Sequence, residues 1–436
     1  MKSTVLTFAV LLLIGLMSAV PLNCSAAQQA KPPVKHVILI SLDAFNPQWY
    51  QDERWPMPFL QQMASEGAYA RRAKPPFPST TRPGHVTLIT GRFPANHGVY
   101  NNSIPYHIED GSSIFHGVED AGGETASVVW VGANHAPVDH LVNNIGVIDF
   151  SDAELSPPSE DLISSSNWEK KEGHSPKFER YIQGTIRDAQ LASIAVTYIE
   201  RYQPNFLALR FNDTDKTQHM FGRDGAAVKG KVASIDMALA EVNAAVERAG
   251  IAAETVIIVT GDHGMDSISN MVSPNVWLAE SGLGSKDGVK FDTYGGSAFL
   301  YNSDEEETKE IAEMLKNLPE VEKNSFTLLS RSELDELGAD PRATLALSAA
   351  EGYAFNNGWN DPVLKSVNLH GTHGSLATPE TPNNYTGFVI WGAGIKKGTV
   401  LEEIRLQDIA PTAAEFLEIN IGESDGKSRF KDLTVE

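Results

Sequence analysis

The chain has 436 residues, enough for roughly three average domains or for one large α/β domain. Hydrophobic residues make up 42% and charged residues 21%, proportions that are typical of a globular protein and exclude a disordered or collagen-like chain. The formal net charge of -21 argues against a protein that binds polymeric nucleic acid, because phosphate backbones require a basic surface. An anionic small molecule would need a local positive centre, such as a metal ion.

The first residues of the chain have the pattern of an export signal. Lys2 supplies a positive charge, residues 5–20 form an apolar run, and small residues follow at 24–27. We expect residues 1–26 to be removed as a signal peptide, which places the mature protein in a bacterial periplasm or outside the cell. A single membrane anchor and a lipid attached at Cys24 are the alternatives. Because Cys24 is the only cysteine, the mature chain would have no disulfide, and it would have no membrane span.

Short apolar runs alternate with helical patterns along the rest of the chain. This alternation predicts an α/β fold with a central, mostly parallel sheet flanked by helices. Residues 133–184 and 265–370 interrupt the alternation, and we expect them to be cap segments inserted into one domain at 34–436. The predicted strands are residues 37–42, 126–131, 206–211, 256–260 and 387–391, and the predicted helices are residues 187–201, 226–248, 305–318 and 406–417.

Acidic and histidine residues follow three of the predicted strands. Asp43 comes after the first strand, Asp215 and His219 after the third, and Asp262 and His263 after the fourth. In an open α/β sheet the carboxyl ends of the strands face one ligand crevice, so these side chains would converge. A single Asp at a strand end is more often a helix cap or a turn residue, and only the convergence of several favours a site.

The spacing of these residues is typical of metal ligands. Asp215 and His219 lie four residues apart, which puts both side chains on one face of a helical turn. His373 adds a third histidine in a glycine-flanked turn at 371–374. Asp together with His favours zinc or another divalent transition ion, whereas magnesium and calcium prefer all-oxygen sites. Six such ligands are too many for one tetrahedral site and fit two ions, the arrangement that suits in-line displacement at phosphorus.

A hydroxyl group precedes the apolar segment at 86–90. Thr81 lies near the predicted N-terminus of a helix that has Pro83 in its first turn. Thr81 could simply cap this helix or could be a nucleophile, and the two roles are compatible because a helix N-terminus favours an alkoxide and an adjacent phosphate. We expect His85 and His97 to brace this region by hydrogen bonds rather than to bind metal.

Together these motifs resemble the nucleotide pyrophosphatase/phosphodiesterase family of the alkaline phosphatase superfamily. The nucleophile pattern of that family, a Thr followed after one residue by Pro and later by Thr-Gly, is similar to residues 81–91. Residues 209–219, 260–265 and 371–374 resemble its three metal-binding segments, in the order that the family has them.

The resemblance implies an alkaline-phosphatase-like fold with two zinc ions, for which other divalent transition metals could substitute. Thr81 would be the nucleophile, bound to the second ion, and would form a phospho-threonine intermediate, while Asn102 would hydrogen-bond a phosphoryl oxygen. A metal ion lowers the pKa of a bound hydroxyl, so no separate base would be needed. The resemblance assigns the first zinc to Asp215, His219 and His373, and the second to Asp43, Asp262 and His263.

The resemblance also bears on the substrate. One monoesterase branch of the superfamily has a Lys-x-Arg where residues 130–135 read Trp-Val-Gly-Ala-Asn-His, which is similar to the Trp-Pro-Gly of the diesterases. Arg82 and Arg210 stand where nucleotide-cleaving members have aromatic residues. Two arginines favour a small-molecule phosphodiester or pyrophosphate that carries a second anionic group, held by bidentate contacts. The alternative is that one of these arginines pairs with a carboxylate of the protein.

Other functions remain alternatives at the level of the sequence. A phosphomonoesterase on the same fold would use Arg82 or Arg210 to bind the extra phosphate charge. A non-catalytic exported protein that binds metal or phosphate would not require Thr81, and an adhesion module would bind no metal.

Overall fold

The computed structural model describes residues 34–103, 112–142 and 176–435, with side chains described from 187 onward in the last range except at 369. The predicted signal peptide at 1–26, with Cys24, lies outside these ranges, as does most of the predicted cap segment at 133–184. None of the helices within the described ranges is long and apolar enough to cross a membrane.

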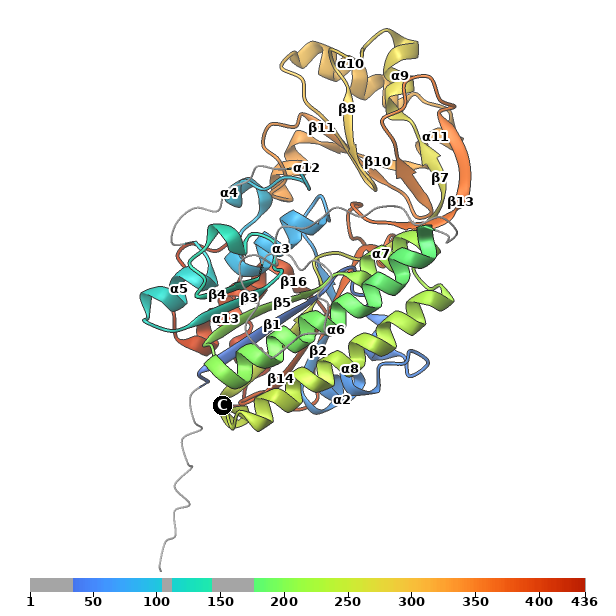
Figure 1. Ribbon diagram of the computed structural model, residues 1–436. Coiled ribbons are helices and arrows are strands. Elements are labelled where there is room, and N and C mark those ends of the chain that lie inside the picture. Colours follow the sequence, from blue (N-terminus) through green and yellow to red (C-terminus); the bar gives the residue numbers. More distant parts are fainter. Residues whose placement is uncertain (1–33, 104–111, 143–175, 436) are drawn as a thin grey trace, which may run out of the picture. The chain divides into compact units, whose positions relative to one another are not determined.

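The described strands build one large sheet and two small ones (Figure 1). Over the described ranges, the large sheet has nine strands in the order β15-β2-β14-β6-β1-β5-β3-β4, with β16 paired to β2. In chain order these strands are β1 (His36–Leu42), β2 (Ala68–Lys74), β3 (Thr125–Val128), β4 (His140–Val142), β5 (Phe206–Phe211), β6 (Thr255–Thr260), β14 (Thr386–Gly392), β15 (Thr399–Leu401) and β16 (Ile404–Arg405). At the centre β6, β1 and β5 are parallel, and Ile40 of β1 lies opposite Val259 and Leu209.

All five predicted strands belong to the large sheet, with two corrections. β14 runs antiparallel to both of its neighbours, β6 and β2, because an apolar run fixes burial but not direction. β3 ends at Val128 rather than at residue 131, since Val129 has a left-handed backbone with a φ of 50°. β2 was not predicted because its exposed Arg71 and Arg72 break the apolar pattern.

Helices cover both faces of the large sheet. One hydrophobic cluster packs β1 and β5 against α2, α6 and α8, and a second packs the other face against α3, α5 and α13. The helices are α1 (Gln48–Gln51), α2 (Pro58–Glu66), α3 (Thr81–Thr90), α4 (Pro94–His97), α5 (Ile114–Asp120), α6 (Pro176–Tyr202), α7 (Asp213–Phe221), α8 (Ala226–Arg248), α13 (Ile409–Leu417) and α14 (Phe430–Leu433). The predicted helix at 226–248 is therefore confirmed, and the one predicted at 187–201 is the second half of α6.

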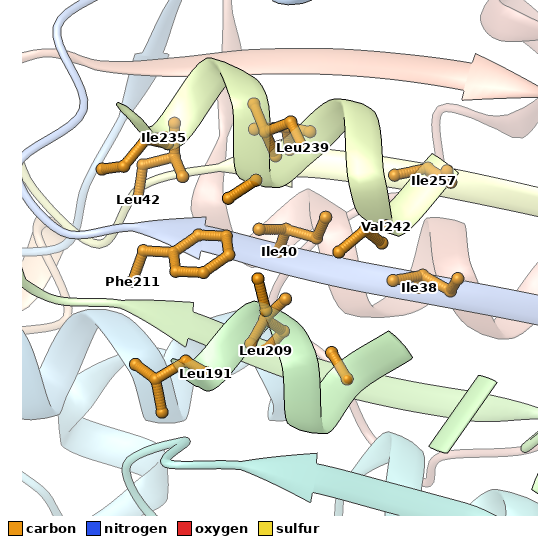
Figure 2. Close-up of a cluster of buried hydrophobic side chains, with 14 of the residues drawn as sticks. Ile38, Ile40, Leu42, Leu191, Leu209, Phe211, Ile235, Leu239, Val242 and Ile257 are labelled. Carbon is orange, nitrogen blue, oxygen red and sulfur yellow. The ribbon is translucent and has the colours of Figure 1, made fainter. Parts of the chain in front are cut away.

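Alternate residues of β1 point to opposite layers. Ile38, Ile40 and Leu42 belong to the first cluster, whereas Val37 and Leu39 belong to the second. Figure 2 shows the first cluster, in which α8 crosses one side of β1 and α6 lies beside β5. A strand buried on both faces reads as the continuous apolar run from which it was predicted.

A cluster of buried charged residues joins α6, α7 and α8. Lys231 of α8 is 1% exposed, and its Nζ lies 3.7 Å from Oδ2 of Asp213, which begins α7. Asp188 of α6 is also buried, and burial together with the charge of Asp213 raises its pKa well above the usual range while Lys231 opposes this rise. The cluster therefore fixes α7, which carries two of the predicted ligands, against α6 and α8.

We expect Lys231→Met to lower the free energy of unfolding by about 3–5 kcal/mol, because it removes the buried cation of the cluster and leaves only the half-exposed Lys216, 3.6 Å from Oδ1 of Asp213, beside the buried carboxylates. Urea unfolding measures this change. The control is Lys229→Met, two residues earlier on α8, where an exposed ammonium lies 5.6 Å from the ring of Trp55 and is worth about 1 kcal/mol or less. Equal losses in both variants would contradict the assignment.

The two small sheets occupy the stretch at 265–370 that was predicted as a cap, and the last strand of the smaller one continues to Thr372 (Figure 1, yellow to orange). Their strand orders are β10-β11-β9-β8 and β12-β7-β13. The elements are β7 (Asp266–Val272), α9 (Pro274–Ser281), β8 (Phe291–Tyr294), β9 (Ser297–Leu300), α10 (Glu305–Lys316), α11 (Glu320–Lys323), β10 (Phe326–Ser330), α12 (Arg331–Glu336), β11 (Leu345–Ala349), β12 (Tyr353–Phe355) and β13 (Leu364–Thr372). An isolated bridge joins Gly374, after β13, to Ser79, before α3, so the chain returns beside the N-terminus of α3.

Candidate metal centre

The predicted ligands gather at the carboxyl edge of the three central strands. Asp43 directly follows β1, and Asp262 with His263 comes one residue after β6. β5 is followed after one residue by α7, whose helical turn puts Asp215 and His219 on one face as their spacing predicted. The sixth ligand, His373, arrives from β13 rather than from the large sheet.

Asp215, His219 and His373 form the first cluster, in which one candidate ligand atom from each lies within 4.8 Å of the others. Nε2 of His219 is 3.2 Å and Nε2 of His373 is 3.8 Å from Oδ1 of Asp215. The opposite ring nitrogens are also held, since Nδ1 of His219 lies 2.8 Å from the Gly371 carbonyl oxygen and Nδ1 of His373 lies 3.2 Å from that of Ser79. These contacts orient both Nε2 atoms inward.

Asp43, Asp262 and His263 form the second cluster, which has the same ligand-atom spacing. Nε2 of His263 lies 3.4 Å from Oδ1 of Asp43 and 3.2 Å from Oδ2 of Asp262, while its Nδ1 lies 2.8 Å from the Gly264 carbonyl oxygen. The two clusters adjoin, because the rings of His263 and His373 stack with centroids 3.8 Å apart.

Three buried oxygen atoms in these clusters accept no hydrogen bond from any residue that the structure describes. They are Oδ1 of Asp43, Oδ1 of Asp215 and Oδ2 of Asp262, and each faces an inward imidazole nitrogen. Buried carboxylate oxygens without a partner are costly, and they fit a cation better than any neighbouring protein group. The donor set of three carboxylates and three imidazoles suits zinc or a similar transition ion in each cluster.

The ionisation of the ligands also fits a metal. Burial lowers the pKa of His373 to about 3 and lowers that of His263, so both imidazoles are neutral at pH 7. Burial opposes the ionisation of Asp215, but the combined interactions with His219, His373 and His263 outweigh it and lower the pKa of this carboxyl group. Burial lowers the pKa of His219, but its interactions with Asp215, the Gly371 carbonyl group and Asp43 together raise it to about 9, so metal binding would displace a proton from this ring.

Thr81 is the first residue of α3, and its Oγ1 lies 3.3 Å from Nε2 of His263. The helix is capped by Thr80, and neither hydroxyl makes a side-chain capping hydrogen bond. Nδ1 of His85, one turn later, lies 2.8 Å from the Thr81 carbonyl oxygen and 3.3 Å from Oδ2 of Asp262, so His85 braces the segment as expected. The hydroxyl of Thr81 is thereby directed at the second cluster.

Gly84 lets α3 approach this cluster. A Cβ atom at this position would lie 2.4 Å from the Asp262 carbonyl oxygen, which no side chain tolerates. The glycine of the motif therefore allows the close approach of Thr81 to the second cluster.

Asn102 and Arg210 lie at different points of the site. Oδ1 of Asn102 accepts the backbone N–H of Arg82 at 2.9 Å, which places the Asn102 side chain at the N-terminus of α3 beside Thr81. Arg210 of β5 donates through Nε, at 3.0 Å, and through Nη2 to Oδ2 of Asp43. Arg210 therefore holds one oxygen of Asp43, while the other faces His263.

This contact supports the alternative role for Arg210, in which the arginine pairs with a carboxylate of the protein and positions Asp43. We expect Arg210→Met to lower kcat at least tenfold with little change in KM, because Asp43 would lose the two donors that fix its orientation. Steady-state kinetics on an aryl phosphodiester measures this split. A higher KM for substrates with a second anionic group and an unchanged kcat would instead mean that Arg210 binds substrate.

Sequence reasoning did not find the groups that hold the ligands. The Thr214 hydroxyl donates to the Asp43 carbonyl oxygen, and Nε2 of Gln218 donates to that of Ala44 at 2.9 Å, so α7 is tied to the loop after β1. The carbonyl oxygens of Gly371 and Ser79 hold the rings of His219 and His373 in the same way. No residue pattern marks such carbonyl groups before the fold is known.

These observations define the class of protein: an α/β protein with two adjoining candidate metal sites at one edge of its central sheet. The family model of the Type I phosphodiesterase / nucleotide pyrophosphatase matches residues 37–376. The chain belongs to this family, and so to the alkaline phosphatase superfamily, as the motifs predicted.

Individual relatives are distant. Ectonucleotide pyrophosphatase/phosphodiesterase family member 7 from Mus musculus is 25% identical over 249 residues, which cover 54% of this chain and 51% of the relative. Bis(5'-adenosyl)-triphosphatase enpp4 from Xenopus laevis is 24% identical over 253 residues, covering 57% and 51%. The chain thus matches about half the length of these curated relatives. The structure of human ectonucleotide pyrophosphatase/phosphodiesterase 5 superimposes with a TM-score of 0.65 at 19% identity, covering 92% of this chain and 100% of that one, and shares the fold.

Proposed function

We propose that this protein is an exported, dinuclear metal-dependent hydrolase of small-molecule phosphodiester or phosphoanhydride bonds, with Thr81 as its nucleophile. The observation that carries the proposal is the position of the Thr81 hydroxyl at the N-terminus of α3. This hydroxyl lies 3.3 Å from His263 of the second cluster, and the second cluster adjoins the first through the stacked rings of His263 and His373. A related protein supports the role of the threonine, since murine ectonucleotide pyrophosphatase/phosphodiesterase 5 is described with AMP in an inactive threonine-to-alanine variant.

The residues of the site divide the reaction between them. Divalent ions held by the two clusters would stabilise negative charge on the attacking and leaving oxygens. Thr81 Oγ1 loses its proton to solvent and attacks phosphorus, an O–P bond forms, and the bond to the leaving oxygen breaks as that oxygen gains a proton from solvent. Water then cleaves the phospho-threonine and returns a proton to Thr81. Asn102 and the N-terminus of α3 bind the remaining phosphoryl oxygens, and His85 keeps Thr81 aligned with Asp262.

The experiment for this proposal compares kcat/KM of the zinc-loaded protein on bis(p-nitrophenyl) phosphate and on p-nitrophenyl phosphate. A preference for the diester supports the proposed function, and a preference for the monoester would make the protein a phosphomonoesterase. Two bound metals without turnover of either compound would favour a binding protein.

Export is part of the proposal and rests on the pattern of residues 1–26 alone. N-terminal sequencing of the protein from the culture medium or periplasm of its host tests it. A mature chain that begins close to residue 27 is expected, and a retained N-terminus would contradict cleavage.

A further inference from the structure

A cleft of about 660 Å³ lies outside the two metal-ligand clusters, between the loop at 100–103 and the β8–β9 hairpin. Its lining is polar and aromatic and carries charges of both signs. The lining residues on which the argument depends are Asn101, Asp292, Tyr294, Tyr301, Asn302 and Arg342.

The walls of the cleft are the segments that position the candidate site. Asn101 adjoins Asn102 in the chain, and its Nδ2 donates to the Tyr294 hydroxyl at 3.0 Å. Tyr294 leads into the turn of the hairpin, where the backbone N–H of Gly296 donates to the His373 carbonyl oxygen at 2.8 Å. The cleft is therefore joined to the phosphoryl-binding side of the site through Asn102 and to the first cluster through His373.

Arg342 projects into this cleft in a fixed orientation. Its Nε and Nη2 donate at 2.9 and 2.6 Å to Asp340, a carboxylate that is 1% exposed, while the arginine side chain is 63% exposed. The guanidinium lies over the rings of Tyr100 and Tyr301, at 4.6 and 5.8 Å from their centroids, and the Tyr301 hydroxyl donates to Asp340. Because Nε and Nη2 are bound to Asp340, the remaining N–H donors of the guanidinium can bind a ligand. The side chain is already held in place, so binding costs little side-chain entropy.

We propose that this cleft is a substrate subsite, in which Arg342 binds a second anionic group that is joined to a hydroxyl-bearing part of the substrate. The inference rests on the proposed function. Guanidinium groups recognise phosphoryl and carboxylate oxygens. Because the chain has a net charge of -21, an anionic part of the substrate needs a local cation, and Arg342 supplies one. The Asp292 carboxylate and the Asn302 amide in the same lining suit hydroxyl groups and disfavour a bare polyanion. A phosphoanhydride such as ADP-ribose has this combination.

The test compares ADP-ribose with bis(p-nitrophenyl) phosphate, which has no second anionic group, on the zinc-loaded protein. We expect Arg342→Met to lower the ratio of their kcat/KM values at least tenfold through a higher KM for ADP-ribose, and Arg342→Lys to lower it less. The matched control is Arg72→Met, because Arg72 is likewise paired with a carboxylate, Glu403 at 2.8 Å, and lies over a tyrosine ring, Tyr385 at 5.1 Å. The control should leave the ratio unchanged.

Direct binding gives a second readout that does not depend on turnover. Calorimetry with ribose 5-phosphate and the zinc-loaded Thr81→Ala variant should show affinity that falls at least tenfold when Arg342→Met is added. Equal affinities, or an unchanged kcat/KM ratio, would overturn the subsite. Failure of the proposed function is distinct, because the wild-type protein would then hydrolyse neither compound while ribose 5-phosphate would still report on the cleft.

Discussion

Replacing Thr81 with alanine is expected to lower kcat on phosphodiesters by about 10³-fold or more while both metals stay bound. The hydroxyl faces His263 at 3.3 Å and makes no helix-capping hydrogen bond, so its loss removes the attacking atom without a structural role. Initial rates and metal analysis of the purified variant measure both parts of this expectation.

Thr81→Ser is the matched variant for this test, because it keeps a hydroxyl at the same position. We expect it to retain far more activity than Thr81→Ala. If Thr81→Ala turned over diesters within tenfold of the wild-type rate, water rather than Thr81 would be the nucleophile, and the account of the second cluster would need revision.

Replacing Asp262 with asparagine is expected to reduce the metal content from two ions to one per chain and to lower kcat at least a hundredfold, about 3 kcal/mol of barrier. Oδ2 of Asp262 is buried, accepts no hydrogen bond within the described part of the chain and lies 3.2 Å from Nε2 of His263. An amide in its place brings no negative charge to offset that of the ion. Plasma emission spectrometry of the dialysed variant gives the stoichiometry.

Asp236→Asn is the control for a buried aspartate that serves structure alone. Its carboxylate accepts the backbone N–H groups of Phe59 and Leu60 at 3.0 and 2.8 Å, outside both clusters. This variant should lose stability and keep two metals. Loss of metal from Asp236→Asn, or two tightly bound ions in Asp262→Asn, would contradict the assignment of the second cluster.

The central strands and the positions of the candidate ligands could be predicted because buried parallel strands are continuous apolar runs. Their carboxyl ends must share an edge, so Asp43 and Asp262 were placed together before the fold was known. β14 shows the limit of this reasoning, since its direction depends on strand pairing across the sheet, which a local apolar run does not encode.

The charged side chains were less predictable because their partners are distant in sequence. Arg210 and Asp43 are separated by 167 positions, and they meet only because β5 lies beside β1. Arg342 had no motif to mark it, since its orientation depends on Asp340 and on rings from two separate segments. The family resemblance could place Arg210 near the site, but only the fold shows that it contacts Asp43.

The stereochemical course at phosphorus tests the central claim most directly. A diester made chiral at phosphorus with sulfur, hydrolysed by the zinc-loaded protein in isotopically labelled water, reports whether one or two in-line displacements occur. Attack by Thr81 followed by attack of water inverts the configuration twice, so the account predicts net retention. Net inversion would mean direct attack by water and would contradict a phospho-threonine intermediate at Thr81.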